Sequence, residues 1–153
     1  MKIISIYDDI VDYILVKQGG KINAVGTSSA PIVMTSEKEE PGAWGGIHIC
    51  GKAHTNAEGG KGSSEIGGAT YGGNDDADNS GTLKYVRVEY SGYAFDSEHE
   101  ANGITFYGVG NGTTVEYCQA YKGSDDGFEF FGGSVNVSNL VSVSCSDDSF
   151  DWT

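Results

Sequence analysis

Apolar and polar residues alternate in short runs that are separated by glycine and asparagine. The segments 47–49, 104–106 and 128–130 read Ile-His-Ile, Ile-Thr-Phe and Phe-Glu-Phe, and each stands two residues before a glycine. A period of two with β-branched and aromatic side chains predicts short β-strands. No window of about 11 residues keeps the helical period with capping residues at its ends, so we expect an all-β fold.

The second half of the chain contains an internal repeat with an offset of 22 residues. At this offset Asp125 and Asp126 fall on Asp147 and Asp148. The shared pattern is an apolar alternation, then Ser-Asp-Asp, then a small residue, then aromatic-acid-aromatic. A repeat this short cannot build a propeller blade, which needs about 40 residues, but it suits one coil of a parallel β-helix. The leucine and asparagine signature of leucine-rich repeats is absent.

Equivalent residues of successive coils stack into ladders in a β-helix, about 4.8 Å apart, and the inward ladders form its core. Two apolar ladders are expected here. One contains Ile14, Ile47, Ile104, Phe128 and Phe150, and the other contains Val16, Ile49, Phe106, Phe130 and Trp152. The aromatic rings of the last two coils are therefore expected to point inward.

The expected architecture is a single β-helix domain over residues 1–153 with about five coils. The coils are placed at residues 8–30, 31–52, 83–111, 112–134 and 135–153. A long Gly/Asp-rich loop at residues 53–82 interrupts the stack, and such loops are usually either functional or flexible. Because the chain stops directly after an inward strand, we expect either self-association through the C-terminal coil or a fragment of a longer solenoid.

Five motifs carry a resemblance to a known family. They are PGAWGGI at 41–47, YGG at 71–73, NSGTLKYVR at 79–87, FFGG at 130–133 and DDSFDWT at 147–153. Together they resemble secreted or surface-attached bacterial β-helix proteins that are common in Bacteroidetes and often carry a multidrug-transporter label. The resemblance covers about residues 13–153 and implies a right-handed parallel β-helix that is secreted or at the cell surface. It implies no established activity.

The chain is strongly acidic, and its charge is unevenly distributed. The net charge is −13, and residues 75–153 hold 14 of the 22 acidic residues but only three of the nine basic ones. This excludes a nucleic-acid binder that works through phosphate contacts. No stretch approaches the length of a membrane span, and Asp8 and Asp12 interrupt any apolar signal sequence. The cysteines are odd in number and widely spaced, so we expect buried thiols rather than disulfides or a zinc site.

The repeated Ser-Asp-Asp corner is the first candidate site. It is expected to bring together the carboxylates of Asp125, Asp126, Glu129, Asp147, Asp148 and Asp151. Stacked carboxylates about 5 Å apart raise one another's pKa unless a cation or hydrogen bonds intervene. Three interpretations stay open: a Ca²⁺ site, a general acid–base pair for polysaccharide cleavage, and a turn whose side chains bond the backbone. The catalytic candidates are Asp125, Asp126, Asp147 and Asp148.

Two further segments could hold a metal ion. Asp76, Asp78 and Ser80 match the start of a Ca²⁺-binding loop, but Arg87 stands where an EF-hand needs a bidentate Glu, so a looser Ca²⁺ loop and an Asx-rich turn are the alternatives. The other segment contains Asp96, Glu98, His99 and Glu100. A histidine among carboxylates suits a metal ligand or a base, and the alternative is a solvated loop tip.

Tyrosine is frequent in the second half of the chain. Tyr117 and Tyr121, with Glu129 and Asp151, are candidates for glycan binding, because flat rings contact sugars and carboxylates accept their hydroxyl groups. The alternative is that the tyrosines only cover sheet faces. We therefore expect an extracellular binding or display module for glycans, with Ca²⁺ as the candidate cofactor. A polysaccharide-active hydrolase or lyase and a purely structural stalk are the other functions considered, although the scarcity of Lys and Arg disfavours a lyase.

Overall fold

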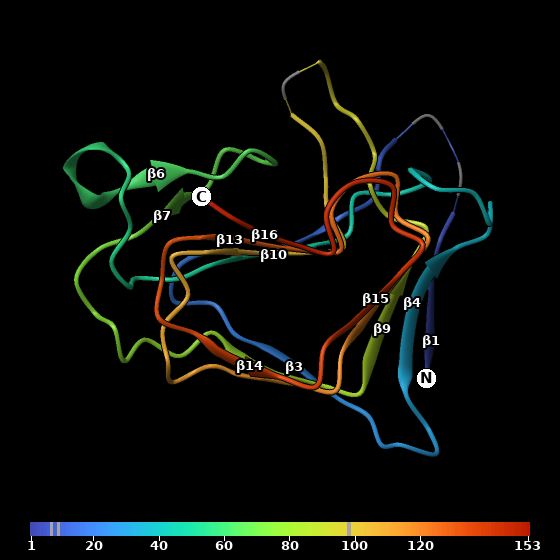
Figure 1. Ribbon diagram of the computed structural model, residues 1–153, viewed down its shortest axis with the longest axis horizontal. Helices are drawn as coiled ribbons and strands as arrows, with labels where there is room; N and C mark the ends of the chain where they lie inside the picture. Colours follow the sequence, from blue (N-terminus) through green and yellow to red (C-terminus); the bar gives the residue numbers. More distant parts are fainter. Residues whose placement is uncertain (7, 9, 98) are drawn as a thin grey trace.

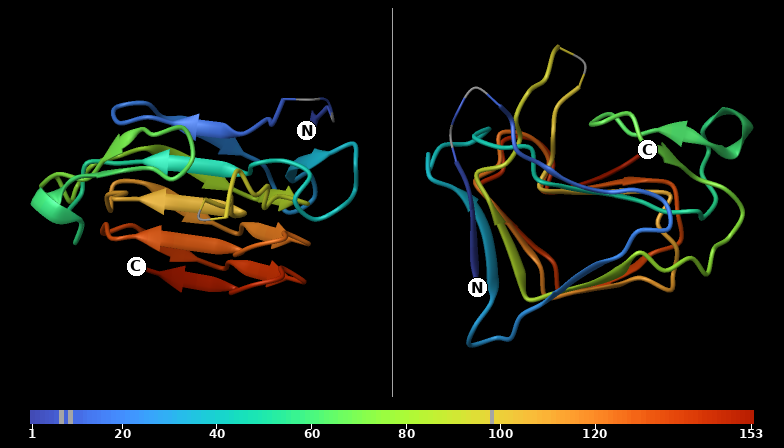
Figure 2. Two further views of the ribbon diagram at one scale, coloured as in Figure 1. Left: turned by 90° about the horizontal axis from the view of Figure 1, so that it is seen from above. Right: turned by 180° about the vertical axis from the view of Figure 1, so that it is seen from behind.

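A computed structural model describes residues 1–6, 8, 10–97 and 99–153. Its strands form three parallel sheets that stack coil upon coil as a parallel β-helix (Figure 1, Figure 2). In Figure 1 the chain winds anticlockwise as its coils approach the reader, so the helix is right-handed. This confirms the expected fold class. Within the described residues no helix has the length and apolar character needed to cross a membrane.

The three sheets are named A, B and C. Sheet A contains, in spatial order, β1 (Lys2–Ser5), β4 (Ile32–Ser36), β9 (Val86–Glu89), β12 (Gln119–Tyr121) and β15 (Val141–Val143). Sheet B contains β16 (Phe150–Trp152), β13 (Phe128–Phe131), β10 (Ile104–Tyr107), β5 (Ile47–Cys50) and β2 (Ile14–Val16). Sheet C contains β14 (Asn136–Ser138), β11 (Thr114–Glu116), β8 (Gly81–Lys84) and β3 (Ile22–Val25). Every pair within these sheets is parallel.

The apolar ladders have the register that the repeat predicts. In sheet B, Phe128 pairs with Ile104 on one side and with Phe150 on the other. The ring of Phe130 stacks on Phe106 at 5.0 Å and on Trp152 at 5.4 Å between centroids. Trp152 is nevertheless 68% exposed, because β16 is the outermost strand of sheet B among the described residues. The expected self-association through this coil stays a prediction.

The corners of the coils repeat an uncommon backbone conformation. Between sheets C and A, and again directly after sheet A, one non-glycine residue in each of the last three coils has a positive φ of 51–62°. These residues are Tyr85, Tyr117 and Asn139 at the first corner, and Tyr90, Lys122 and Ser144 at the second. The left-handed conformation costs a non-glycine residue about 1–2 kcal/mol, so the stacked strands on both sides must enforce it.

Two segments rise on the outer side of sheet B (Figure 1). The first is the insertion between β5 and β8, residues 51–80, which carries the 3-10 turn η1 (Glu58–Gly60) and the antiparallel pair β6 (Gly62–Ser63) and β7 (Thr70–Tyr71). The second is the loop 92–101 between β9 and β10, drawn in yellow in Figure 1. The prediction placed the insertion at 53–82, but its last two residues belong to β8. It also missed β1, which pairs with β4.

Candidate functional site

A small polar cleft opens on the outer side of sheet B, between the insertion and the loop 92–101. Its volume is about 150 Å³, and it is lined by Glu65, Ser97, Glu100, Asn102, Asp125, Asp126 and Glu129. We call it the acidic cleft. Glu129 reaches it because successive side chains of a strand point to opposite faces, and its neighbours Phe128 and Phe130 point inward.

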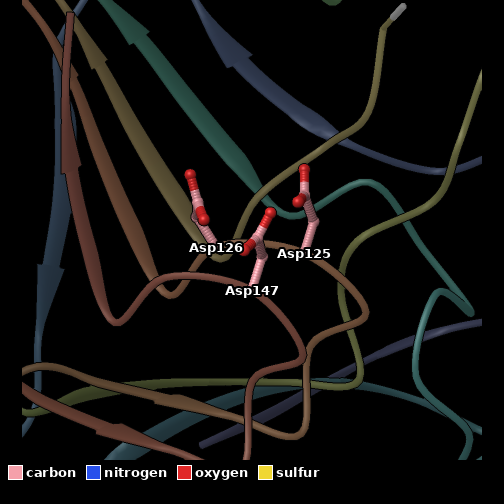
Figure 3. Close-up of side chains that lie close together, drawn as sticks. All are labelled: Asp125, Asp126 and Asp147. Carbon is pink, nitrogen blue, oxygen red and sulfur yellow. The ribbon is translucent and has the colours of Figure 1, made fainter. Parts of the chain in front are cut away.

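The carboxylates of the repeated corner converge beside this cleft. Asp125, Asp126 and Asp147 each offer a ligand oxygen within 4.8 Å of the others, and Asp126, Glu129 and Asp151 do the same. Asp126 is common to both groups. Figure 3 shows the first group, in which Asp147 of one coil lies between Asp125 and Asp126 of the coil before it. The expected stacking of equivalent corners is therefore present.

The corner itself depends on a close approach of two coils. The backbone N–H of Asp148 donates to Asp126 Oδ1 at 2.8 Å, and the N–H of Gly127 donates to Asp148 O at 2.9 Å. A Cβ atom on Gly127 would lie 2.9 Å from the carbonyl oxygen of Ser149, so only glycine fits here. One oxygen of Asp126 thus serves the turn, as one of the three interpretations expects.

Burial and mutual repulsion raise the pKa of three carboxyl groups. Burial is the largest cause for each of them. The pKa of Asp125 is raised to about 7, with Asp126, Glu100 and Asp147 adding repulsion. The pKa of Asp126 is raised to about 6 despite the hydrogen bond from Asp148, and that of Glu129 is raised to about 8, with Glu65 as its strongest acidic neighbour. The site therefore favours a proton or a cation over bare negative charge.

Asn102 is a site residue that the sequence reasoning missed. It is only 2% exposed, and its side-chain Nδ2 donates to Glu129 Oε2 and, at 3.3 Å, to Thr105 Oγ1. Its Oδ1 atom is buried and has no hydrogen-bond partner among the described residues. A signal existed: the offset of 24 that pairs Ile104 with Phe128 also relates Asn102 to Asp126.

Glu65 is the second missed residue, and Asp148 is the candidate that the structure leaves aside. Glu65 belongs to the insertion and lies in a Gly-Ser stretch that gave no signal. Burial is the first cause that raises its pKa. The carboxylate of Asp148 belongs to neither three-ligand group and does not line the cleft, although its backbone helps to build the corner.

The two candidate tyrosines lie away from the acidic cleft. Tyr117 is at the corner between sheets C and A, where its ring stacks on Tyr85 at 4.7 Å with Lys84 Nζ at 5.9 Å. Tyr121 ends β12, and Lys122 Nζ lies 5.2 Å from its ring. Neither ring lines the cleft, so the structure does not join them to the carboxylates in one platform.

Asp76, Asp78 and Ser80 hold the end of the insertion in place. Asp76 Oδ1 accepts the backbone N–H of His54 at 3.0 Å and lies 2.7 Å from His54 Nδ1, contacts that lower the pKa of Asp76. Asp78 Oδ2 accepts the N–H of Lys52 at 3.0 Å, and Ser80 is buried. Neither aspartate belongs to a possible metal-ligand group of acidic, His or Cys side chains within the described part of the chain.

The segment around His99 is divided by the structure. His99 Nδ1 lies 2.9 Å from both carboxylate oxygens of Asp96, an exposed contact at the loop tip. Glu100 lines the acidic cleft. Glu98 lies outside the described residues.

The comparison with protein families agrees with this architecture. A family model described as a pectate-lyase-like β-helix domain matches residues 1–153. The chain belongs to this family. Searches of curated proteins and of solved structures found no match. The family assignment of this pectate-lyase-like domain does not test the finer resemblance to secreted Bacteroidetes proteins, which stays a prediction.

The cleft of this pectate-lyase-like domain has a simple chemical repertoire. None of the described residues that line it is Lys, Arg or His. Elimination from a uronate needs a base and positive charge to neutralise the acid, and the lining side chains supply no positive charge. Hard carboxylate and amide oxygens are the ligands that Ca²⁺ prefers. The arrangement can bind a divalent cation or exchange protons.

Proposed function

We propose that this domain is an extracellular binding module that holds Ca²⁺ in the acidic cleft and binds a glycan through that ion. The observation that carries the proposal is the pair of three-carboxylate groups that share Asp126, beside a cleft whose described lining residues include no basic side chain. Calcium takes six to eight oxygen ligands, and neighbouring coils bring oxygens together at suitable spacing.

The turn-building interpretation accounts for only part of this arrangement. The corner needs Asp126 Oδ1 to accept one backbone N–H. The turn-building interpretation does not explain why the carboxylates of Glu129 and Asp151 also converge on Asp126. Burial, and after it the repulsion between these carboxylates, raises the pKa of Asp126 and Glu129, which costs stability when both are ionised. A bound cation removes that cost, which favours the cation-binding interpretation.

The glycan part of the proposal follows from the charge of the whole chain. A net charge of −13 repels acidic polymers, whereas a bound Ca²⁺ leaves coordination positions for sugar hydroxyls or carboxylates. The insertion and the loop 92–101 stand on either side of the cleft and provide walls for an extended chain. Millimolar affinity, typical of extracellular calcium modules, would suit such a role.

Calcium titration of the cation-free protein tests the proposal. We expect Ca²⁺ to raise the melting temperature, because a ligand bound by the native state alone stabilises it. Asp126→Asn should abolish most of the shift, and Asp148→Asn should keep it. Binding to a glycan array should then require Ca²⁺ and be lost in EDTA. The absence of any calcium-dependent shift in the wild type would overturn the cation site, and glycan binding that survives EDTA would overturn its bridging role.

Hydrolysis of a polysaccharide is a second candidate, and one observation favours it. Glu129 has a pKa raised to about 8, so it is protonated at neutral pH without a cation and could act as a general acid. Its carboxylate lies within 4.8 Å of that of Asp151, near the spacing of about 5–5.5 Å in retaining glycosidases. Release of reducing ends in EDTA, lost in Glu129→Gln, would support hydrolysis over binding alone.

A further inference from the structure

The insertion contributes an acidic residue to the cleft, although the insertion is far from the repeated corner in sequence. Glu65 lines the same cleft as Asp126 and Glu129, and its charge is the strongest acidic influence on Glu129. Among the described residues that line the cleft none is basic, and the nearest positive influence on Glu65 is the charge of His99, whose Nδ1 lies 2.9 Å from Asp96. Two carboxylates on separate segments therefore line one cleft and repel each other, and no basic side chain of the described residues lines the cleft with them.

The other side of the insertion is firmly attached to sheet B. Tyr71 and Ala69 pack on Cys50 and Tyr107 in a small apolar cluster. Gln18 Nε2 donates to the carbonyl oxygens of Gly51 at 2.7 Å and Gly72 at 2.8 Å, at the two ends of this packed region. This packing holds Glu65 beside the cleft although its charge repels that of Glu129. The repulsion therefore destabilises the segment of the insertion that carries Glu65.

Asn102 supplies an independent indication of a missing partner. A buried polar atom without a hydrogen bond is uncommon and costs about 1–3 kcal/mol. Asn102 Oδ1 is such an atom, in a side chain 2% exposed that lines the cleft. Its orientation is set by the amide group, because Nδ2 donates to the carboxylate of Glu129. An amide oxygen beside two carboxylates is a typical calcium ligand.

We propose that a divalent cation held by Glu129 and Asn102 Oδ1 also binds Glu65 and so locks the insertion onto sheet B. This inference rests on the proposed cation site and assigns a further role to it. The corner carboxylates supply most of the affinity, and Glu65 couples that affinity to the position of the insertion. The cation then links the insertion to sheet B, a link that we call the pin, and it also binds the glycan.

Hydrogen exchange of the full chain tests the pin. Amides of residues 62–71 should exchange at least about tenfold more slowly with about 5 mM Ca²⁺ than with EDTA, because bound cation suppresses local opening. Glu65→Gln should remove this protection. Glu58→Gln, an exposed glutamate of η1 in the same insertion that does not line the cleft, should keep it.

The outcomes separate the two proposals. If Glu65→Gln loses the protection of residues 62–71 but keeps a calcium-dependent rise in melting temperature, both proposals stand. If Glu65→Gln retains the protection, the pin is wrong and the cation site remains. If the wild type shows a rise in melting temperature without added protection, the pin is again wrong. If neither effect occurs in the wild type, the cation site itself is wrong.

Discussion

The two faces of sheet B bury different kinds of side chain. On the inner face, Phe106 and Phe130 stack at 5.0 Å in a dry apolar ladder. On the outer face, Glu129 is almost equally buried, at 7% exposure, among other carboxylates. Phe130 and Glu129 are neighbours in β13, so the same stacked backbone positions both side chains. The inner face builds the fold, and the outer face uses the rigidity that the fold supplies.

The comparison shows that the outer face of sheet B contributes less to the stability of the fold than the inner face does. The inner ladder contains only apolar groups, which gain from burial. The outer face buries polar atoms that lack partners among the described residues, such as His48 Nδ1 and Asn102 Oδ1. Burial also lowers the pKa of His48 to about 4, so its imidazole is neutral at physiological pH. Local conflicts of this kind are expected at functional sites, where binding matters more than folding.

The largest expected effect comes from the inner face. Phe106→Ala should lower the free energy of unfolding by about 3–5 kcal/mol, because it removes a fully buried ring and leaves a cavity. Trp152→Ala in the adjoining exposed coil is the matched control and should cost about 1 kcal/mol or less. Urea unfolding measures both, and equal losses would contradict the comparison.

The next effect comes from the outer face as a whole and depends on pH. Asp125, Asp126 and Glu129 have native pKa values raised to about 7, 6 and 8, so the native state binds protons more tightly than the unfolded chain does. Their contribution to stability is therefore full below about pH 4 and is lost as the pH rises through 6 to 8. In EDTA, the melting temperature should fall by about 5 °C or more between pH 5 and 9.

Calcium should flatten this pH dependence, because the ion replaces the protons that the site loses. Scanning calorimetry across the pH series, with and without Ca²⁺, measures the difference. A cation-free protein that becomes more stable from pH 5 to 9 would contradict the raised pKa values.

A single carboxylate should show a smaller effect of the same sign. In EDTA at pH 9, Glu129→Gln should stabilise the protein by about 1 kcal/mol, a value already reduced for solvent screening. The reason is that the substitution removes a buried charge that the native state disfavours. At pH 4 the gain should vanish, since Glu129 is then protonated. Chemical unfolding at the two pH values measures it, and a loss of stability at pH 9 would refute the account.

The smallest expected effect lies at the corner away from the cleft. Tyr117→Asn exchanges the stacked ring for the residue type found one coil later at Asn139, where φ is also positive. The loss of ring stacking, about 1 kcal/mol, is offset by the better tolerance of Asn for this conformation. The free energy of unfolding should change by less than about 1 kcal/mol, and calcium binding should not change. A loss of calcium binding would show that this corner and the cleft are coupled.

The repeat predicted the core well because ladder positions follow from spacing along the chain. The offset of 22 placed Phe128 over Phe150 and Asp125 over Asp147, as the structure shows. Contacts between the repeat and a non-repeating segment have no such spacing. This is why Glu65, and the pairing of β1 with β4, could not be found from the sequence pattern.

The same limit explains the tyrosines. Spacing gives the position of a residue along a coil, and it does not show which corners face the same ligand. Tyr117 and Asp125 are eight residues apart, yet they belong to different corners of the triangular coil. Asn102 could have been found, because the offset of 24 that pairs Ile104 with Phe128 also relates Asn102 to Asp126.

Because the corner conformation recurs, one coil is a structural unit that can be repeated. Tyr117 and Asn139 have φ values of 55° and 55°, and Lys122 and Ser144 have 53° and 56°, each pair separated by one repeat. Duplicating residues 112–133 in tandem would extend the rod by about 4.8 Å and copy the Ser-Asp-Asp corner. The length of the solenoid is thus set by the number of coils, and each added coil of this kind would add one acidic corner at a regular spacing.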